Sequence, residues 1–127
     1  MARWEYFTED EMKCKGTDEC HMDEEFMERL IRLRESFDRP MIITSGYRDR
    51  AYNTTIGGSP NSAHLYGKAV DVLVSGHEAY DLLRLAILHD FTGIGVSQRG
   101  MHERRFLHID TMEDSDTSPR PWIWSYK

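Results

Sequence analysis

The stretch "SAHLYGKAVDV", residues 62–72, carries a histidine and then an aspartate into a run that ends as a β-strand. Residues 68–74, "KAVDVLV", alternate as a strand does, so that Asp71 shares one face with Ala69 and Leu73. Burying an unpaired carboxylate in a sheet costs several kcal/mol. Asp71 is therefore either solvated at a sheet edge or held by a positive group.

A second predicted strand suggests what that positive group is. In "RFLHIDTM", residues 105–112, His108 and Asp110 project to the same face. If the two strands pair, His64, Asp71 and His108 converge. Two imidazoles and one carboxylate leave one position of a tetrahedron free, which is typical of catalytic zinc. Taken singly, a histidine is more often a surface or hydrogen-bonded residue than a metal ligand, and that alternative stays open.

The composition of the chain limits the classes of function. A length of 127 residues predicts a single domain, residues 1–127, with one hydrophobic core. The formal net charge of -6 argues against nucleic acid as a partner, because phosphate binding needs a basic surface. No apolar run approaches the roughly 18 residues that a membrane span needs. The N-terminus lacks the apolar segment of a signal peptide, and a monomer is the default expectation.

The order of predicted elements indicates an α+β fold with an antiparallel or mixed sheet. Two amphipathic helices and a short capped helix are expected at residues 22–38, 76–91 and 8–13. Strands are expected at 41–46, 68–74, 93–96 and 105–112, a loop with at most one helical turn at 47–63, and an extended tail at 118–127.

Two cysteines, Cys14 and Cys20, are too few for a disulfide framework. With His21 beside them they would still need a fourth zinc ligand, which the nearby sequence does not supply. Structural or free thiols in a loop are the favoured interpretation.

Four segments of the chain, "SGYR", "GGSPNSAHLYGKAVDV", "FLHIDT" and "RPWIWSY", resemble the zinc D-Ala-D-Ala carboxypeptidase family of cell-wall peptidases. The likeness is greatest to a short branch often encoded by bacteriophages, and the wider fold group includes lysostaphin-type enzymes and the zinc domain of hedgehog proteins. It covers nearly the whole chain, and its most specific part is the Ser-x-His-x-x-Gly-x-Ala-x-Asp motif from Ser62 to Asp71. The resemblance implies a zinc site of the hedgehog/D-Ala-D-Ala-peptidase type on a central, mostly antiparallel sheet flanked by helices.

The same resemblance implies roles for individual residues. The zinc ligands would be His64, Asp71 and His108. Arg48 matches an arginine that reads the substrate in related dipeptidases, and its fork can bind a carboxylate or carbonyl in a bidentate manner. A surface ion pair with Asp49, or with an acidic residue of a helix, is the alternative for Arg48. Further substrate-contact candidates are Asn61 and Ser62, for which a loop-capping role is the alternative. Aromatic candidates for a substrate-binding groove are Tyr47, Tyr52, Tyr66, Trp122 and Trp124, and packing in the core or on the surface is the alternative for most of them.

The catalytic base is where this chain departs from the family pattern. Several relatives carry a glutamate three residues before the last zinc ligand, where this chain has Arg105. Others carry a histidine two residues before it, where this chain has Phe106. Asp110 is the first candidate for the base, although it can equally orient a ligand imidazole. Glu103 and His102, in the loop before the strand, are the next candidates.

The function predicted by this resemblance is a zinc-dependent hydrolase of peptidoglycan. It would cut peptide bonds that contain D-amino acids, as an endolysin-like endopeptidase or as a D,D-carboxypeptidase. Such an enzyme would be made in the cytoplasm and would reach the cell wall after release, as a phage lysin does, or as a virion component. The alternatives are a zinc domain that binds without cutting and a structural domain of a virion.

Overall fold

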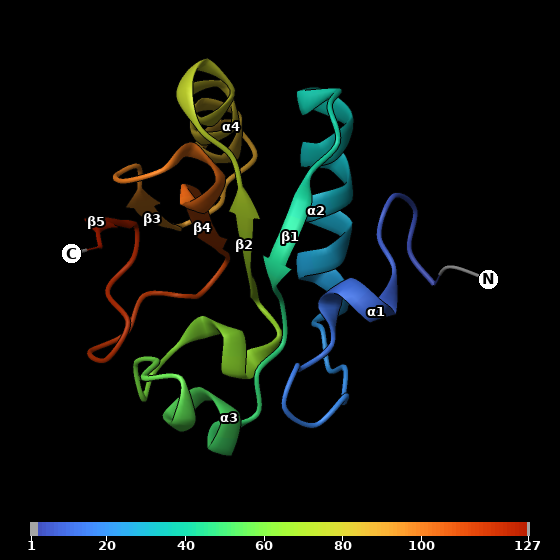
Figure 1. The fold of residues 1–127 in the computed structure, drawn as a ribbon, viewed down its shortest axis with the longest axis vertical. Helices are drawn as coiled ribbons and strands as arrows, with labels where there is room; N and C mark the ends of the chain where they lie inside the picture. The colour runs from blue at the N-terminus through green and yellow to red at the C-terminus, as the bar shows by residue number, and fades with distance from the viewer. Residues whose placement is uncertain (1–2, 127) are drawn as a thin grey trace.

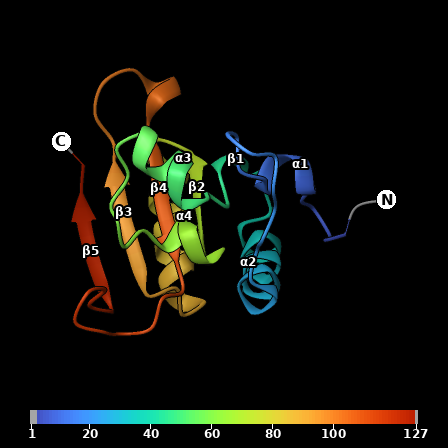
Figure 2. The same ribbon diagram turned by 90° about the horizontal axis from the view of Figure 1, so that it is seen from below.

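A five-stranded mixed sheet organises the computed structural model, which describes residues 3–126. Residues 1–2 and 127, the ends of the predicted domain, lie outside the described residues. The strands follow the order β1-β2-β4-β3-β5, which can be traced in Figure 2. Their bounds are Ile42–Ser45 for β1, Ala69–Leu73 for β2, Gly93–Ser97 for β3, Phe106–Asp110 for β4 and Trp122–Ser125 for β5. All neighbours are antiparallel except β3 and β5, which are parallel.

The helices flank this sheet, which confirms the predicted α+β class (Figure 1). Two long helices, α2 (Glu24–Phe37) and α4 (Gly76–Leu88), carry the main apolar faces. The short elements are α1 (Glu9–Met12), α3 (Arg50–Thr55) and the 3₁₀ turns η1 (Ala63–Tyr66) and η2 (His102–Arg104). No helix among residues 3–126 has both the length and the apolar character needed to cross a membrane.

Alternation along the central strands separates the core from a polar face. Val70, Val72, Leu107 and Ile109 of β2 and β4 are buried in one apolar cluster with residues of α2 and α4. The residues between them point to the opposite face of the sheet. Asp71 lies on that second face, so its carboxylate does not enter the apolar core.

The turn before β2 is fixed by local bonds and by one glycine. Ser62 Oγ accepts a hydrogen bond from the backbone N–H of His64 at 3.2 Å. Gly67 ends the η1 turn with a φ of 67°, in the left-handed region. A Cβ at this position would overlap the backbone of residues 21–23, whose Asp23 N–H donates to the Gly67 carbonyl at 2.9 Å. The motif glycine is thus required by its conformation and by this close approach.

Two segments differ from the sequence expectation. Residues 50–55 form the helix α3, which is longer than the one helical turn expected within that loop, because the Asp49 carboxylate accepts from the N–H of Tyr52 at 2.7 Å and caps it. The tail, expected only to be extended, pairs with β3 as the strand β5. Both cysteines are free thiols, in line with the favoured interpretation.

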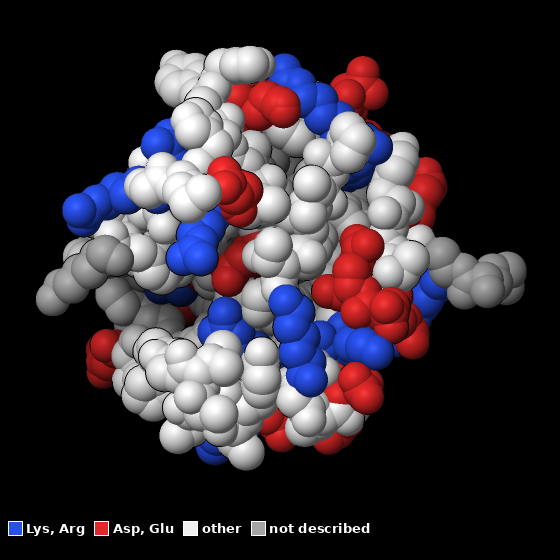
Figure 3. Space-filling view, viewed as in Figure 1, with Lys and Arg blue, Asp and Glu red and all other residues white. Residues whose placement is uncertain are grey.

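Charge is mixed over the face of the molecule shown in Figure 3. Acidic and basic side chains alternate there, and the basic ones do not gather into one continuous surface.

Candidate metal centre

One row of residues across the sheet brings the predicted ligands together. Asp71 of β2 faces His108 of β4 directly in the antiparallel register. Gly95 of β3 faces His108 on its other side, and Trp124 of β5 faces Gly95. The pairing of β2 with β4, on which the predicted convergence of the ligands depends, is therefore present.

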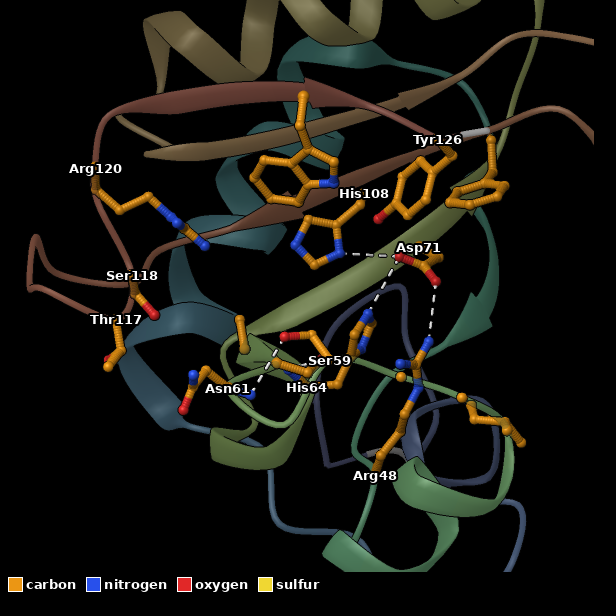
Figure 4. A pocket seen from close by; sticks show the side chains of 17 residues that line it. Arg48, Ser59, Asn61, His64, Asp71, His108, Thr117, Ser118, Arg120 and Tyr126 are labelled. Atoms are coloured by element: carbon orange, nitrogen blue, oxygen red, sulfur yellow. Dashed lines mark hydrogen bonds and ion pairs between the residues drawn. The ribbon is translucent and has the colours of Figure 1, made fainter.

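Three donor atoms converge above this row (Figure 4). Asp71 Oδ1 lies 3.2 Å from His64 Nε2 and 3.1 Å from His108 Nδ1. The ligand atoms of the three residues all lie within 4.8 Å of one another. In the part of the chain that the structure describes, this is the one group of three or more His, Cys, Asp or Glu side chains with such a convergence.

The second nitrogen of each ring has its own acceptor. His64 Nδ1 lies 2.7 Å from the carbonyl oxygen of Gly46, and His108 Nε2 lies 2.7 Å from Asp110 Oδ2. Because a carbonyl and an ionised carboxylate only accept, these nitrogens carry the protons. In a neutral ring the other nitrogen, on the side of Asp71, would then have its lone pair available to a metal ion. This donor set fits a metal ion, since metal-bound histidines usually donate their other N–H to such acceptors.

The electrostatics favour the ligating form of His64 and of Asp71, but not that of His108. Burial lowers the pKa of His64, which favours the neutral imidazole. Burial acts to raise the pKa of Asp71, but the adjacent His64 and His108 outweigh it and hold that pKa well below its usual range. Burial acts to lower the pKa of His108, and its hydrogen bonds to Asp110 and Asp71 raise it instead.

A cavity of about 480 Å³ opens over the three residues. The loop of residues 56–63, with the predicted Asn61 and Ser62, forms one wall. Thr117, Ser118 and the segment that contains β5 form another. The polar substrate-contact candidates from this loop therefore line the cavity.

Arg48 also lines the cavity, and its side chain is only 14% exposed. Its Nη2 lies 3.4 Å from Asp71 Oδ2, while Nε and Nη1 donate to Ser45 Oγ at 3.1 Å and Asn53 Oδ1 at 3.2 Å. Arg48 thus pairs with the ligand Asp71 rather than with Asp49. Two of its five N–H groups stay free of these three bonds.

The predicted aromatic contacts are only partly brought to the cavity. Tyr47 packs against the core instead, with its ring edge-to-face on His21 at a centroid distance of 5.1 Å. Tyr66 and Trp122 are exposed, and neither lines the cavity. Trp124 does line it, with its ring 5.1 Å from that of His108.

The three candidates for the base lie away from the cavity surface. Asp110 is completely buried behind His108, and it accepts hydrogen bonds from His108 and Arg120. Burial acts to raise its pKa, but these two partners lower it to about 2. His102 and Glu103 lie in η2 and line a different cavity, near the start of α4. The geometry of Asp110 supports the orienting role.

Two residues of the site were missed by the sequence analysis. Arg120 and Tyr126 line the cavity because the parallel pairing of β5 with β3 brings their segment to the site. The Tyr126 hydroxyl points towards His108 and Asp71 in Figure 4. Burial raises the pKa of Tyr126 to about 12. The segment "RPWIWSY" was one of those that carry the family resemblance, but the sequence did not indicate which strand it would pair with.

Comparison with known proteins gives two matches. A family model described as Peptidase M15 matches residues 5–110. The chain is also similar to the zinc D-Ala-D-Ala carboxypeptidase of Streptomyces albus G, with 35% identity over 69 residues. These residues are 54% of this chain but only 27% of that relative.

Proposed function

The chain belongs to the peptidase M15 family, and from this premise we propose that it is a zinc-dependent peptidase whose substrates are peptides of bacterial peptidoglycan. The observation that carries the proposal is the convergence of His64 Nε2, Asp71 Oδ1 and His108 Nδ1 on one point at the floor of a cavity. The name of the relative from Streptomyces albus G supports both the metal and the D-amino-acid substrate.

Zinc suits this donor set, because two imidazoles and one carboxylate leave a coordination position for the reaction. When bound, zinc supplies a Lewis acid that polarises a peptide carbonyl and makes water a stronger acid. The protein's own contribution is to fix the ligands: Gly46 and Asp110 hold the rings of His64 and His108 through their outer nitrogens.

Arg48 has two tasks in this proposal. Its Nη2 holds the outer oxygen of Asp71, so that Oδ1 faces the histidines. Its two remaining N–H groups can donate to a substrate carbonyl in the cavity and offset negative charge that develops there.

Tyr126 supplies a second donor. With a pKa of about 12, its phenol keeps its proton at neutral pH. The hydroxyl points towards His108 and Asp71, so it can donate to the oxygen of a carbonyl under attack. Phe106, where some relatives carry a histidine, packs against the Tyr126 ring at 5.1 Å and helps to hold it.

The Tyr126→Phe variant is expected to lower kcat about 100-fold while KM changes little, because only a hydroxyl that bonds in the transition state is lost. Steady-state hydrolysis of a soluble stem peptide measures both constants. Tyr66→Phe, at an exposed tyrosine outside the cavity, is the matched control. An unchanged kcat in Tyr126→Phe would remove this residue from the mechanism.

The ion pairs of the cavity favour cleavage within a peptide rather than at its free end. Of the described cations that line it, Arg48 is paired with Asp71 and Arg120 with Asp110. Both arginines are thus already engaged by a carboxylate, and the two N–H groups that Arg48 keeps are those assigned above to a substrate carbonyl. We therefore propose endopeptidase activity ahead of D,D-carboxypeptidase activity. The enzyme would reach the cell wall either by release as a phage lysin or as a component of a virion.

A domain that binds zinc without cutting, including a structural domain of a virion, is the second candidate. It is favoured by one observation: Asp71, itself a proposed ligand, is the one carboxylate among the described residues that line the cavity. A separate carboxylate base of the usual kind is not found there.

The test measures metal content and hydrolysis together. We expect about one zinc per purified chain, and hydrolysis of purified peptidoglycan that a chelator stops and added zinc restores. Paired peptides, with D-alanyl-D-alanine at a free C-terminus or inside a longer chain, separate the two activities. Zinc without hydrolysis of any of these substrates would favour the second candidate, and a protein that binds no zinc would contradict both.

A further inference from the structure

The buried carboxylate of Asp110 lies between a proposed metal ligand and an arginine. Its Oδ2 accepts from His108 Nε2 at 2.7 Å and from Arg120 Nη2 at 2.8 Å, and its Oδ1 accepts from Arg120 Nε at 3.0 Å. We infer that Arg120 is a positioning residue for the metal centre: it fixes Asp110, and Asp110 fixes the ring of His108. This inference rests on the proposed zinc site.

The sheet leaves space for the Asp110 carboxylate opposite a glycine. Gly93 faces it across β3 and β4, and a Cβ on Gly93 would overlap both carboxylate oxygens. The N–H of Met112 also donates to Oδ1 at 3.2 Å. Because no part of Asp110 is exposed, water cannot replace these partners. The direction of the carboxylate is therefore set by the protein alone.

Arg120 is held as firmly as the carboxylate that it binds. Its Nη1 donates to the carbonyl of Pro119 at 2.8 Å, and its backbone N–H donates to Asp114 Oδ1 at 2.8 Å. Its guanidinium lies 5.3 Å from the centre of the Trp124 ring, and the side chain is 10% exposed. All three guanidinium nitrogens thus have partners within the protein.

The fork geometry explains why an arginine is needed. Without a cation, a fully buried Asp110 would lose its charge or turn away from its site. A lysine would neutralise it as a point charge, but only an arginine holds both oxygens in one plane. With that plane fixed, Oδ2 stays aligned on His108 Nε2, and His108 Nδ1 stays directed at Asp71 and His64.

The consequence is specific to metal binding. Partners of metal-bound histidines typically contribute 10- to 100-fold to metal affinity. Arg120 lies beyond residue 110, where the match to the family model ends. The segment that follows that match therefore contributes to the centre through this contact.

The experiment compares zinc dissociation constants, measured by competition with a chromophoric chelator. Arg120→Gln is expected to bind zinc about tenfold more weakly than the parent, Arg120→Lys less than tenfold, and Asp110→Asn between about 10- and 100-fold. Combining Arg120→Gln with Asp110→Asn is expected to add little to the loss of Asp110→Asn alone, since both act on His108 along one path. The cobalt-loaded Arg120→Gln protein is expected to show a shifted absorption spectrum.

A matched control separates this role from general stability. Arg39→Gln removes another arginine–aspartate ion pair, to Asp81 at 3.0 Å, which is more exposed and lies away from the cavity, and its zinc affinity is expected to be unchanged. Thermal melting of the metal-free proteins shows which variants fold. If Arg120→Gln does not fold, the zinc affinity of Arg120→Lys is the deciding measurement. Parent-like affinity in the folded Arg120 variants, or fully additive losses in the double variant, would refute the inference and leave the zinc site standing. A parent protein without zinc would refute the site itself.

Discussion

Replacing His64 with alanine is expected to abolish zinc binding and to lower peptide hydrolysis about a thousandfold or more. His64 Nε2 is one of three converging donors, and its ring is held from behind by the Gly46 carbonyl. The loss of a metal that contributes several kcal/mol to transition-state stabilisation corresponds to a factor of this size, since each 1.36 kcal/mol is tenfold. Metal analysis of the purified variant and its rate on a stem peptide measure both effects.

His77 provides the control for this prediction. It is an exposed histidine at the start of α4, and it lines a different cavity from His64. His77→Ala is expected to retain the zinc content and the rate of the parent. If His64→Ala kept its zinc, the assignment of the ligands would be wrong even with activity reduced.

The Gly67→Ala variant is expected to lose at least about 3 kcal/mol of unfolding free energy. A residue with a Cβ at a φ of 67° carries about 1–2 kcal/mol of backbone strain. The added methyl group would in addition overlap the backbone of residues 21–23, which has little freedom to move because Asp23 caps α2. The resulting shift would also displace the turn that carries His64. Urea unfolding of the metal-free protein measures the loss.

Gly100→Ala separates the two contributions. Gly100 also has a positive φ, 77°, but a Cβ there would meet nothing within 4 Å. The expected loss is about 1–2 kcal/mol, from backbone strain alone. Equal losses in the two variants would mean that the contact with residues 21–23 does not matter.

The ligands of the site could be predicted because their signals are local. His64 and Asp71 are seven residues apart in one motif, and His108 stands in a strand whose alternation is visible in the sequence. The amphipathic helices α2 and α4 were predictable for the same reason. In each case, residues close in the chain carry the pattern that the fold uses.

The wall of the cavity formed by β5 could not be predicted in this way. Arg120 and Tyr126 reach the site through a parallel pairing of β5 with β3, a contact between residues nearly 30 positions apart. Nothing in the local pattern of "WIWS" says which strand it joins. The environment of Asp110 was also only partly predictable. The side of the sheet on which it lies follows from the alternation of the strand, but its burial under Arg120 does not. That burial favours an orienting role over proton transfer.

The position of Asp71 opposite His108 also determines when conformational entropy is lost. Both side chains belong to paired strands, and their partners hold them in one rotamer. The entropy of ordering them is therefore lost when the sheet forms, not when the metal arrives. In domains that fold only when their metal binds, this entropy is lost at the moment of binding, and its cost reduces the free energy of binding. In this protein the folding of the sheet already orders Asp71 and His108, so the metal binds to ligands that are preorganised.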